Sequence, residues 1–235
     1  MNRIRQAVVL AAGRGARMGE MTAEMPKPML RIQGKPILEH VLDRLAEAGV
    51  ERFFVVIGYR REVIVEHFHN WRLPIQFRVQ EPVNGTGSAA RLARDFTRKD
   101  PFLVTFGDIL CDPAAYLACA AALGEKTEAV MGVRHVDDPY QGAAVYERGG
   151  LIYRVLEKPP KGASQTNWNS AGLYVLRPTA YKFLERLTPS PRNEFELTQV
   201  FDLMLGDGRE VRIAPIDGLW RDIGRPEDLA ALNGL

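Results

Sequence analysis

The chain has 235 residues, 46% of them hydrophobic and 26% charged, and 31 Lys and Arg residues against 29 Asp and Glu give a net charge of +2. Such a composition is ordinary for soluble globular proteins. The balanced charge argues against a nucleic-acid or membrane-surface binder, which would be more basic. No apolar run approaches the length of a membrane span.

The N-terminus and the cysteines both bear on location. The apolar run Ala7–Ala12 follows Arg3 and Arg5, but it is too short for a signal peptide. The two cysteines, Cys111 and Cys119, form neither a metal pattern nor a disulfide framework. We therefore expect a cytoplasmic protein.

Strands and helices alternate through the first half of the chain. The hydrophobic pattern predicts buried strands at Val8–Ala12, Arg52–Ile57, Ile75–Gln80 and Phe102–Phe106. It predicts helices at Pro36–Ala48, at Glu62–Phe68 and after Ser88, which we expect to act as an N-cap. This alternation implies a parallel sheet with helices on both faces.

The second half has a more antiparallel pattern. It predicts strands at Glu128–Val136, Gly142–Val155 with a turn at Gly149-Gly150, Leu173–Leu176 and Val211–Ile216. The helices expected there are Pro178–Leu187, Glu196–Leu205 and Pro226–Leu232. The predicted fold is a single α/β domain over residues 1–235. It has a Rossmann-like mixed, mainly parallel sheet, helices on both faces and a more antiparallel C-terminal elaboration.

The first predicted strand leads into the basic loop Gly13–Arg17, and Lys27 follows between Pro26 and Pro28. Glycines let backbone N–H groups approach phosphate oxygens, and the cations offset the phosphate charge. A dinucleotide-binding loop would need a third glycine where Met18 stands, and the Gly-Lys-Ser/Thr of a Walker A loop is absent. The loop therefore favours a nucleotide enzyme outside those two classes.

Two carboxylates, Asp108 and Asp222, stand where a metal could be held. Asp108 directly follows a strand and a glycine, although it could instead cap a helix that begins near Asp112. Asp222 could instead pair with Arg221 or Arg225 on a solvated loop. Carboxylates without Cys or His ligands suit a hard cation such as Mg²⁺. Ligands in open α/β sheets bind at the carboxyl ends of strands, where Asp108, the basic loop and the turn after Gln80 are all expected.

The order of these motifs resembles that of the sugar-phosphate nucleotidylyltransferases. The most specific block is Leu10-Ala11-Ala12-Gly13-x-Gly15-x-Arg17-Met18 with Pro26-Lys27-Pro28-Met29-Leu30. Weaker blocks follow in the family's order: Gly85-Thr86-Gly87-Ser88-Ala89, Gly107-Asp108, Glu157-Lys158-Pro159, Gly172-Leu173-Tyr174, Glu196-Leu197-Thr198 and Trp220-x-Asp222-x-Gly224. The resemblance covers residues 8–228.

The resemblance implies transfer of a nucleoside monophosphate from an NTP to a sugar 1-phosphate, with release of pyrophosphate. Residues 1–110 would bind the nucleotide and residues 111–235 the sugar phosphate. Arg17 and Lys27 would be catalytic, and Asp108 and Asp222 would hold Mg²⁺. The nucleotide contacts implied are Leu10, Ala11, Ala12, Gly13, Gly15, Gln80, Gly85 and Thr86.

The resemblance also addresses substrate choice. Gln80 stands where uridylyl and thymidylyl members contact the pyrimidine, and an amide has the donor and acceptor that uracil or thymine requires, so UTP or dTTP is favoured. The alternative is an edge-strand glutamine that faces water. The implied sugar contacts are Gly142, Glu157, Asn169 and Gly172; Ser170 stands where some members have asparagine.

Two other functions remain open at this point. One is a cytidylyltransferase for a polyol or choline phosphate, which shares the N-terminal block; the other is a non-catalytic nucleotide sensor. The sequence contains no segment like the left-handed β-helix of some relatives, so we expect no acetyltransferase activity. The expected partners are an NTP and a sugar 1-phosphate, without nucleic acid or membrane. No sequence feature indicates the oligomeric state.

Overall fold

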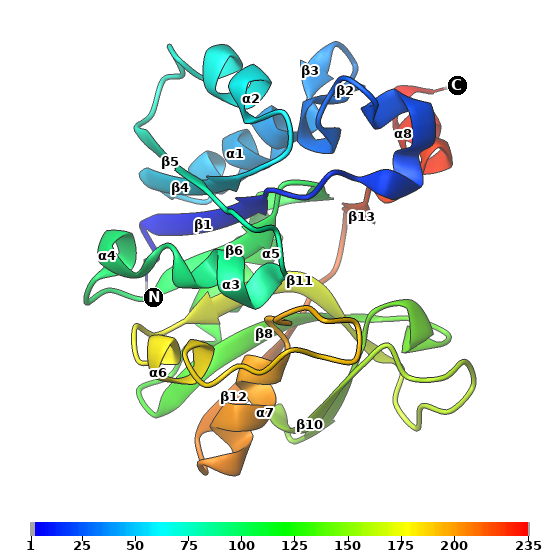
Figure 1. Ribbon diagram of the computed structural model, residues 1–235. Coiled ribbons are helices and arrows are strands. Elements are labelled where there is room, and N and C mark those ends of the chain that lie inside the picture. Colours follow the sequence, from blue (N-terminus) through cyan, green and yellow to red (C-terminus); the bar gives the residue numbers. More distant parts are fainter. Residues whose placement is uncertain (1–2, 235) are drawn as a thin grey trace.

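The structure is a computed structural model that describes residues 3–234. A nine-stranded mixed sheet has the order β5-β4-β1-β6-β11-β8-β12-β10-β9, with helices on both faces (Figure 1). Its strands are β1 (Gln6–Ala11), β4 (Arg52–Ile57), β5 (Ile75–Val79), β6 (Phe102–Phe106), β8 (Thr127–His135), β9 (Ala143–Arg148), β10 (Leu151–Glu157), β11 (Trp168–Leu176) and β12 (Glu210–Pro215).

Shorter elements complete the fold. Two small sheets pair β2 (Arg31–Ile32) with β3 (Lys35–Pro36) and β7 (Ile109–Cys111) with β13 (Trp220–Asp222). The α-helices are α1 (Ile37–Glu47), α2 (Arg61–His67), α3 (Thr86–Arg91), α4 (Arg94–Thr97), α5 (Pro113–Ala121), α6 (Ala180–Leu184), α7 (Gln199–Gly206) and α8 (Pro226–Asn233). The 3₁₀ turns are η1 (Ala16–Thr22), η2 (Lys27–Met29) and η3 (Pro139–Gln141).

The direction of the strands changes between the two halves of the chain. β1 pairs in parallel with β4 and β6, and β4 pairs in parallel with β5. β11 then pairs antiparallel with both β6 and β8, and β9 pairs antiparallel with β10. The predicted fold class is therefore confirmed, since a parallel first half continues into a more antiparallel second half.

The sheet separates two hydrophobic cores. Every residue of β1 is buried, and its side chains alternate between the cores. Val9 belongs to the core that includes residues of α1, α2, α5 and α8, and Val8 to the core that includes residues of α3, α4, α6 and α7. Burial on both faces explains why this strand is a continuous apolar run. In Figure 1 the C-terminal helix α8 returns to the first half of the chain, where Asn233 hydrogen-bonds the Arg31 carbonyl.

Most predicted elements are present, and the differences have local causes. The helix expected from Glu196 begins at Gln199, because the preceding residues hydrogen-bond the loop at residues 84–87. Ser88 is not an N-cap: the helix begins at Thr86, and the Ser88 hydroxyl bonds Asn84 and the Gly85 carbonyl. Within residues 3–234, no helix is both long and apolar enough to cross a membrane.

Candidate active site

A cleft opens at the carboxyl ends of β1 and β6. It has a volume of about 140 Å³ and is lined by Leu10, Ala11, Gly13, Gly15, Arg17, Lys27, Pro28, Gly107, Asp108 and Gly224. The structure thus brings the predicted phosphate loop, both predicted catalytic cations and one predicted metal ligand to one place. Ala12 lies beside it, with its carbonyl accepting a hydrogen bond from the Tyr59 backbone N–H at 3.1 Å.

Lys27 is fixed at the bottom of this cleft. Pro26 and Pro28 restrict its backbone in η2, and the residue is only 5% exposed. Gly15 packs on its aliphatic stem with a φ of +73°, and a Cβ on Gly15 would lie 2.6 Å from the Lys27 Cβ. The Lys27 Nζ donates to Asp108 Oδ2 at 2.5 Å. A buried ammonium is thereby held directly below the glycine loop.

Asp108 and Asp222 are brought together by the β7–β13 pair. Asp222 lies opposite Ile109 in that pair, and the Ile223 backbone N–H donates to the Asp108 carbonyl at 3.0 Å. The surrounding protein displaces water and raises the pKa of Asp222 above its usual value, and the neighbouring Asp108 carboxylate raises it further. Lys27 and Arg17 oppose this rise.

This pair of carboxylates fits a divalent cation. Lys27 occupies one Asp108 oxygen, so the other oxygen and Asp222 remain for a ligand, and a cation would relieve their mutual repulsion. In the described part of the chain, no three His, Cys, Asp or Glu side chains cluster to hold a metal by themselves. Mg²⁺ commonly binds through one or two carboxylates and completes its shell with water and phosphate oxygens.

Arg17 also lines the cleft. It is an exposed residue of η1, and a Cβ on Gly224 would lie 3.5 Å from its Nη1 atom. The guanidinium therefore lies next to the chain that carries Asp222. Two cations therefore line the cleft, Lys27 buried and Arg17 exposed to solvent.

The Gln80 side chain has fewer free hydrogen-bonding groups for a ligand than the sequence alone suggests. It is 6% exposed, and its Nε2 donates to the Gly85 carbonyl and to the Ser88 Oγ, each at 2.8 Å. Both amide hydrogens are thus used inside the protein. In this conformation the Gln80 Oε1 is the group that the side chain can present to a ligand.

The loop after Gln80 is joined to the distant segment 190–198. The Gly87 N–H donates to the Phe195 carbonyl at 2.7 Å, and the Phe195 N–H donates to the Asn84 carbonyl at 2.9 Å. Thr86 Oγ1 accepts from the Leu197 N–H at 3.0 Å, so this side chain supports the protein's own backbone. Gly85 has a φ of +123°, and a Cβ there would lie 2.5 Å from Phe195 backbone atoms.

The same segment holds Glu157. Thr198 Oγ1 donates to Glu157 Oε2 at 3.0 Å, and Arg192 Nη2 lies 3.7 Å from Glu157 Oε1 and 2.6 Å from Glu196 Oε1. The sequence reading did not single out Arg192. Arg192 stands four residues before Glu196, in a run with alternating acidic residues, and this spacing could have indicated an ion pair.

Gly142 and Asn169 meet beside Glu157. β9 lies between β10 and β11, and a Cβ on Gly142 would lie 2.4 Å from Asn169 Oδ1. That oxygen is buried and has no hydrogen-bond partner among the residues that the structure describes, while Asn169 Nδ2 donates to the Ser170 carbonyl at 2.9 Å. An unpaired buried acceptor is costly, so a ligand hydroxyl that donates to it would be stabilised.

Gly172 is placed differently from the other predicted sugar contacts. It has a φ of +69° at a bulge in β11, and a Cβ there would lie 2.3 Å from Ile109 and 2.9 Å from Phe106. Its local role is close packing of β11 on the strand ends that carry Asp108. Trp220, on β13, also reaches this strand, since its Nε1 donates to the Ala171 carbonyl at 2.9 Å.

Comparison with known proteins agrees with this geometry. The family model described as nucleotidyl transferase matches residues 6–234. The chain belongs to this family. The predicted resemblance is thereby confirmed. The chain is 34% identical to the UTP–glucose-1-phosphate uridylyltransferase AglF of Haloferax volcanii, over 95% of this chain and 93% of AglF.

Other relatives are longer. The chain is 35% identical to the bifunctional protein GlmU of Methanococcus maripaludis over 97% of its length, but it spans only 53% of GlmU. A UDP-glucose pyrophosphorylase complexed with UDP-glucose has a TM-score of 0.88 at 20% identity, covering 98% of this chain and 97% of that one. The inositol-1-phosphate CTP transferase of T. maritima has a TM-score of 0.85 at 22% identity, covering 99% and 96%. These two likenesses show the fold alone.

Proposed function

We propose that this chain transfers a nucleoside monophosphate from UTP or dTTP to a sugar 1-phosphate and releases pyrophosphate. The observation that carries this proposal is the pair of the buried Lys27 and the partly exposed Asp108 beside the glycine loop, with Asp222 and Arg17 close by. A displacement at phosphorus needs positioning and charge neutralisation more than covalent help. Two cations and two carboxylates around one small cleft are suited to that task.

Each group has a distinct role in the proposed reaction. The oxygen of the sugar phosphate attacks the α-phosphorus in line with the leaving pyrophosphate. Lys27, fixed by the prolines and Gly15, neutralises charge that grows on the reacting phosphate, and Arg17 faces the pyrophosphate. Asp108 and Asp222 would hold Mg²⁺, which would supply further neutralisation at the α-phosphate and the sugar phosphate when bound. The backbone of Gly13 and Gly15 lets phosphate oxygens come close.

We propose that residues at one end of the site select the base and residues at the other end select the sugar. Gln80 Oε1 can accept from the N3–H of uracil or thymine, whereas cytosine has no hydrogen at N3. Glu157 and the unpaired Asn169 Oδ1 can accept hydrogen bonds from sugar hydroxyls. The name of AglF supports glucose 1-phosphate and UTP as first substrates to try.

The test is pyrophosphate release across a matrix of four NTPs and several sugar, polyol and choline phosphates, with and without Mg²⁺. We expect turnover with UTP or dTTP and a sugar 1-phosphate, and its near loss in Lys27→Ala and Asp108→Ala. Lys35→Ala is the matched control, because Lys35 pairs with Asp43 outside the cleft. Preference for CTP with a polyol or choline phosphate would support the cytidylyltransferase alternative. NTP binding without any turnover would support a sensor.

A further inference from the structure

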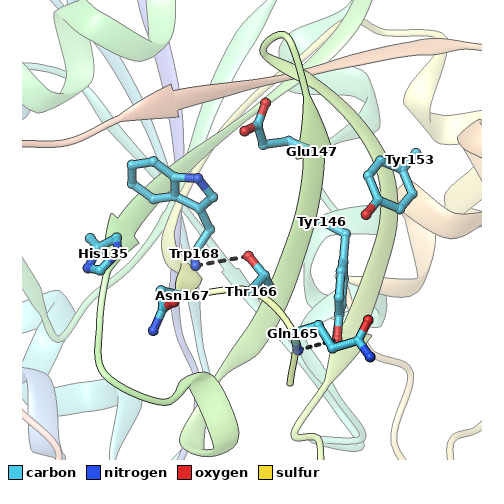
Figure 2. Close-up of a pocket in the computed structure, with 8 residues that line it drawn as sticks. All are labelled: His135, Tyr146, Glu147, Tyr153, Gln165, Thr166, Asn167 and Trp168. Atoms are coloured by element: carbon cyan, nitrogen blue, oxygen red, sulfur yellow. Dashed lines mark hydrogen bonds between the residues drawn. The ribbon is translucent and has the colours of Figure 1, made fainter. Parts of the chain in front are cut away.

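A second, larger cavity lies away from the proposed active site. It has a volume of about 440 Å³, within the range of about 300–1,000 Å³ typical of small-molecule sites. Figure 2 shows Tyr146 and Tyr153 of the β9–β10 hairpin on one side and Trp168 and His135 on the other. We refer to this cavity as the hairpin cleft.

The hairpin cleft is a built feature of the sheet. In the described part of the chain, β9 and β11 pair at one position, Asn169 opposite Ala144. Thr166 spans the gap, since its Oγ1 donates to the Val145 carbonyl at 2.8 Å and accepts from the Trp168 N–H at 3.1 Å. The cleft is therefore preformed by a side chain that replaces the missing strand pairing.

Its position separates it from the sugar end of the proposed active site. Trp168 and Asn169 are consecutive in β11, so their side chains point to opposite faces of the sheet. Asn169 Oδ1 lies against Gly142, whereas the Trp168 ring contacts the His135 ring edge-on, with centroids 5.6 Å apart. A ligand in the hairpin cleft would not compete for the Asn169 oxygen.

The lining combines aromatic rings with unused hydrogen-bonding groups. Within residues 3–234, no protein group hydrogen-bonds the Trp168 indole N–H or the Tyr153 hydroxyl. Glu147 uses only Oε2, which accepts from the Gly150 N–H at 2.8 Å. The indole N–H, the tyrosine hydroxyl and the free carboxylate oxygen thus lie around the aromatic rings. This combination suits a ligand that has both hydroxyl groups and apolar C–H surfaces.

The charge of the lining narrows the ligand class. None of the residues that line the cleft is Lys or Arg, and Glu147 would repel a phosphate. A cationic ligand is disfavoured too, because the Arg154 guanidinium already lies over the Tyr146 ring, 5.4 Å from its centroid. An uncharged ligand with hydroxyls and C–H faces remains. We propose that the hairpin cleft binds an uncharged mono- or disaccharide, separately from the substrate site.

The indole N–H resonances of the full-length chain provide a direct test, which needs no catalysis and so does not depend on the proposed reaction. The chain has three tryptophans, Trp71, Trp168 and Trp220, and Trp168→Phe assigns the relevant signal. Titration with methyl glucoside and with maltose should shift the Trp168 signal saturably while the Trp71 signal stays unchanged. Glucose 1-phosphate should shift the Trp168 signal more weakly than either neutral sugar.

Tyr153→Ala tests the cleft itself. Tyr153 is 57% exposed, so its truncation should leave the fold intact, and loss of one stacking ring should weaken saccharide affinity by about fivefold. Leu151→Ala is the control, because Leu151 is an exposed residue of the same hairpin outside the lining and should leave affinity unchanged. The proposal is overturned if neutral sugars leave the Trp168 signal unmoved, if Tyr153→Ala binds like the parent, or if a choline salt or glucose 1-phosphate binds there more tightly.

Discussion

Replacing Lys27 by methionine separates the proposed catalytic role of this residue from its role in packing. Methionine is close in length and apolar, so it can fill the space against Gly15 while removing the ammonium that contacts Asp108. We expect turnover to fall by about 10²–10³-fold, the loss typical for removal of one preorganised group that stabilises transition-state charge. Affinity for the NTP should change much less, because the charge that Lys27 balances grows in the transition state.

The cost in stability follows from the burial of the ion pair. Breaking a fully buried pair costs about 3–5 kcal/mol. The Asp108 side chain keeps 29% exposure against 7% for Lys27, so water can partly solvate the carboxylate left behind. We therefore expect Lys27→Met to lose about 1–3 kcal/mol in the free energy of unfolding. Lys27→Met combined with Asp108→Asn removes both charges of the pair and should recover most of that loss without recovering turnover.

The measurements are pyrophosphate release and urea denaturation on the parent, both single variants and the double variant. Lys35→Met serves as the control, since Lys35 is 41% exposed and its pair with Asp43 should contribute no more than about 1 kcal/mol. If the double variant regains turnover together with stability, Lys27 acts only as a partner for Asp108 and the catalytic reasoning fails. Parent-like turnover in Lys27→Met would be equally damaging.

Other features of the chain give further expectations. Gly15→Ala should lower both the urea midpoint and turnover, because the added Cβ meets the buried Lys27 at a positive φ. Gly208 has a similar φ but open space around it, so Gly208→Ala should leave turnover unchanged and lower the urea midpoint less than Gly15→Ala does. Thr86→Val should raise the KM for the sugar phosphate by removing the acceptor for the Leu197 N–H, and Thr86→Ser should restore it. Burial raises the pKa of Cys111 to about 11 and that of Cys119 to about 12. A thiol reagent at pH 8 should therefore label neither cysteine until the chain is unfolded. Rapid labelling of the native chain would contradict this expectation.

The fold was predictable where the pattern was local. β4 and β6 have the predicted bounds, because continuous apolar runs mark strands buried on both faces. The β7–β13 pair could not be predicted, since each strand has three residues and its partner is over 100 positions away. That pair nevertheless places Asp222 beside Asp108. The sequence supplied both carboxylates, but only the long-range pairing explains why they meet.

The loop after Gln80 shows a different limit of sequence reasoning. The family resemblance assigned Gln80 and Thr86 to the nucleotide, yet each bonds the protein's own backbone. A side chain's remaining hydrogen-bonding capacity depends on its neighbours in space, which spacing does not record. Since Thr86 supports the segment whose Thr198 holds Glu157, the proposed base-binding and sugar-binding ends of the site share one support. A change in Thr86 should therefore be felt at the sugar phosphate, at the opposite end of the site from the base.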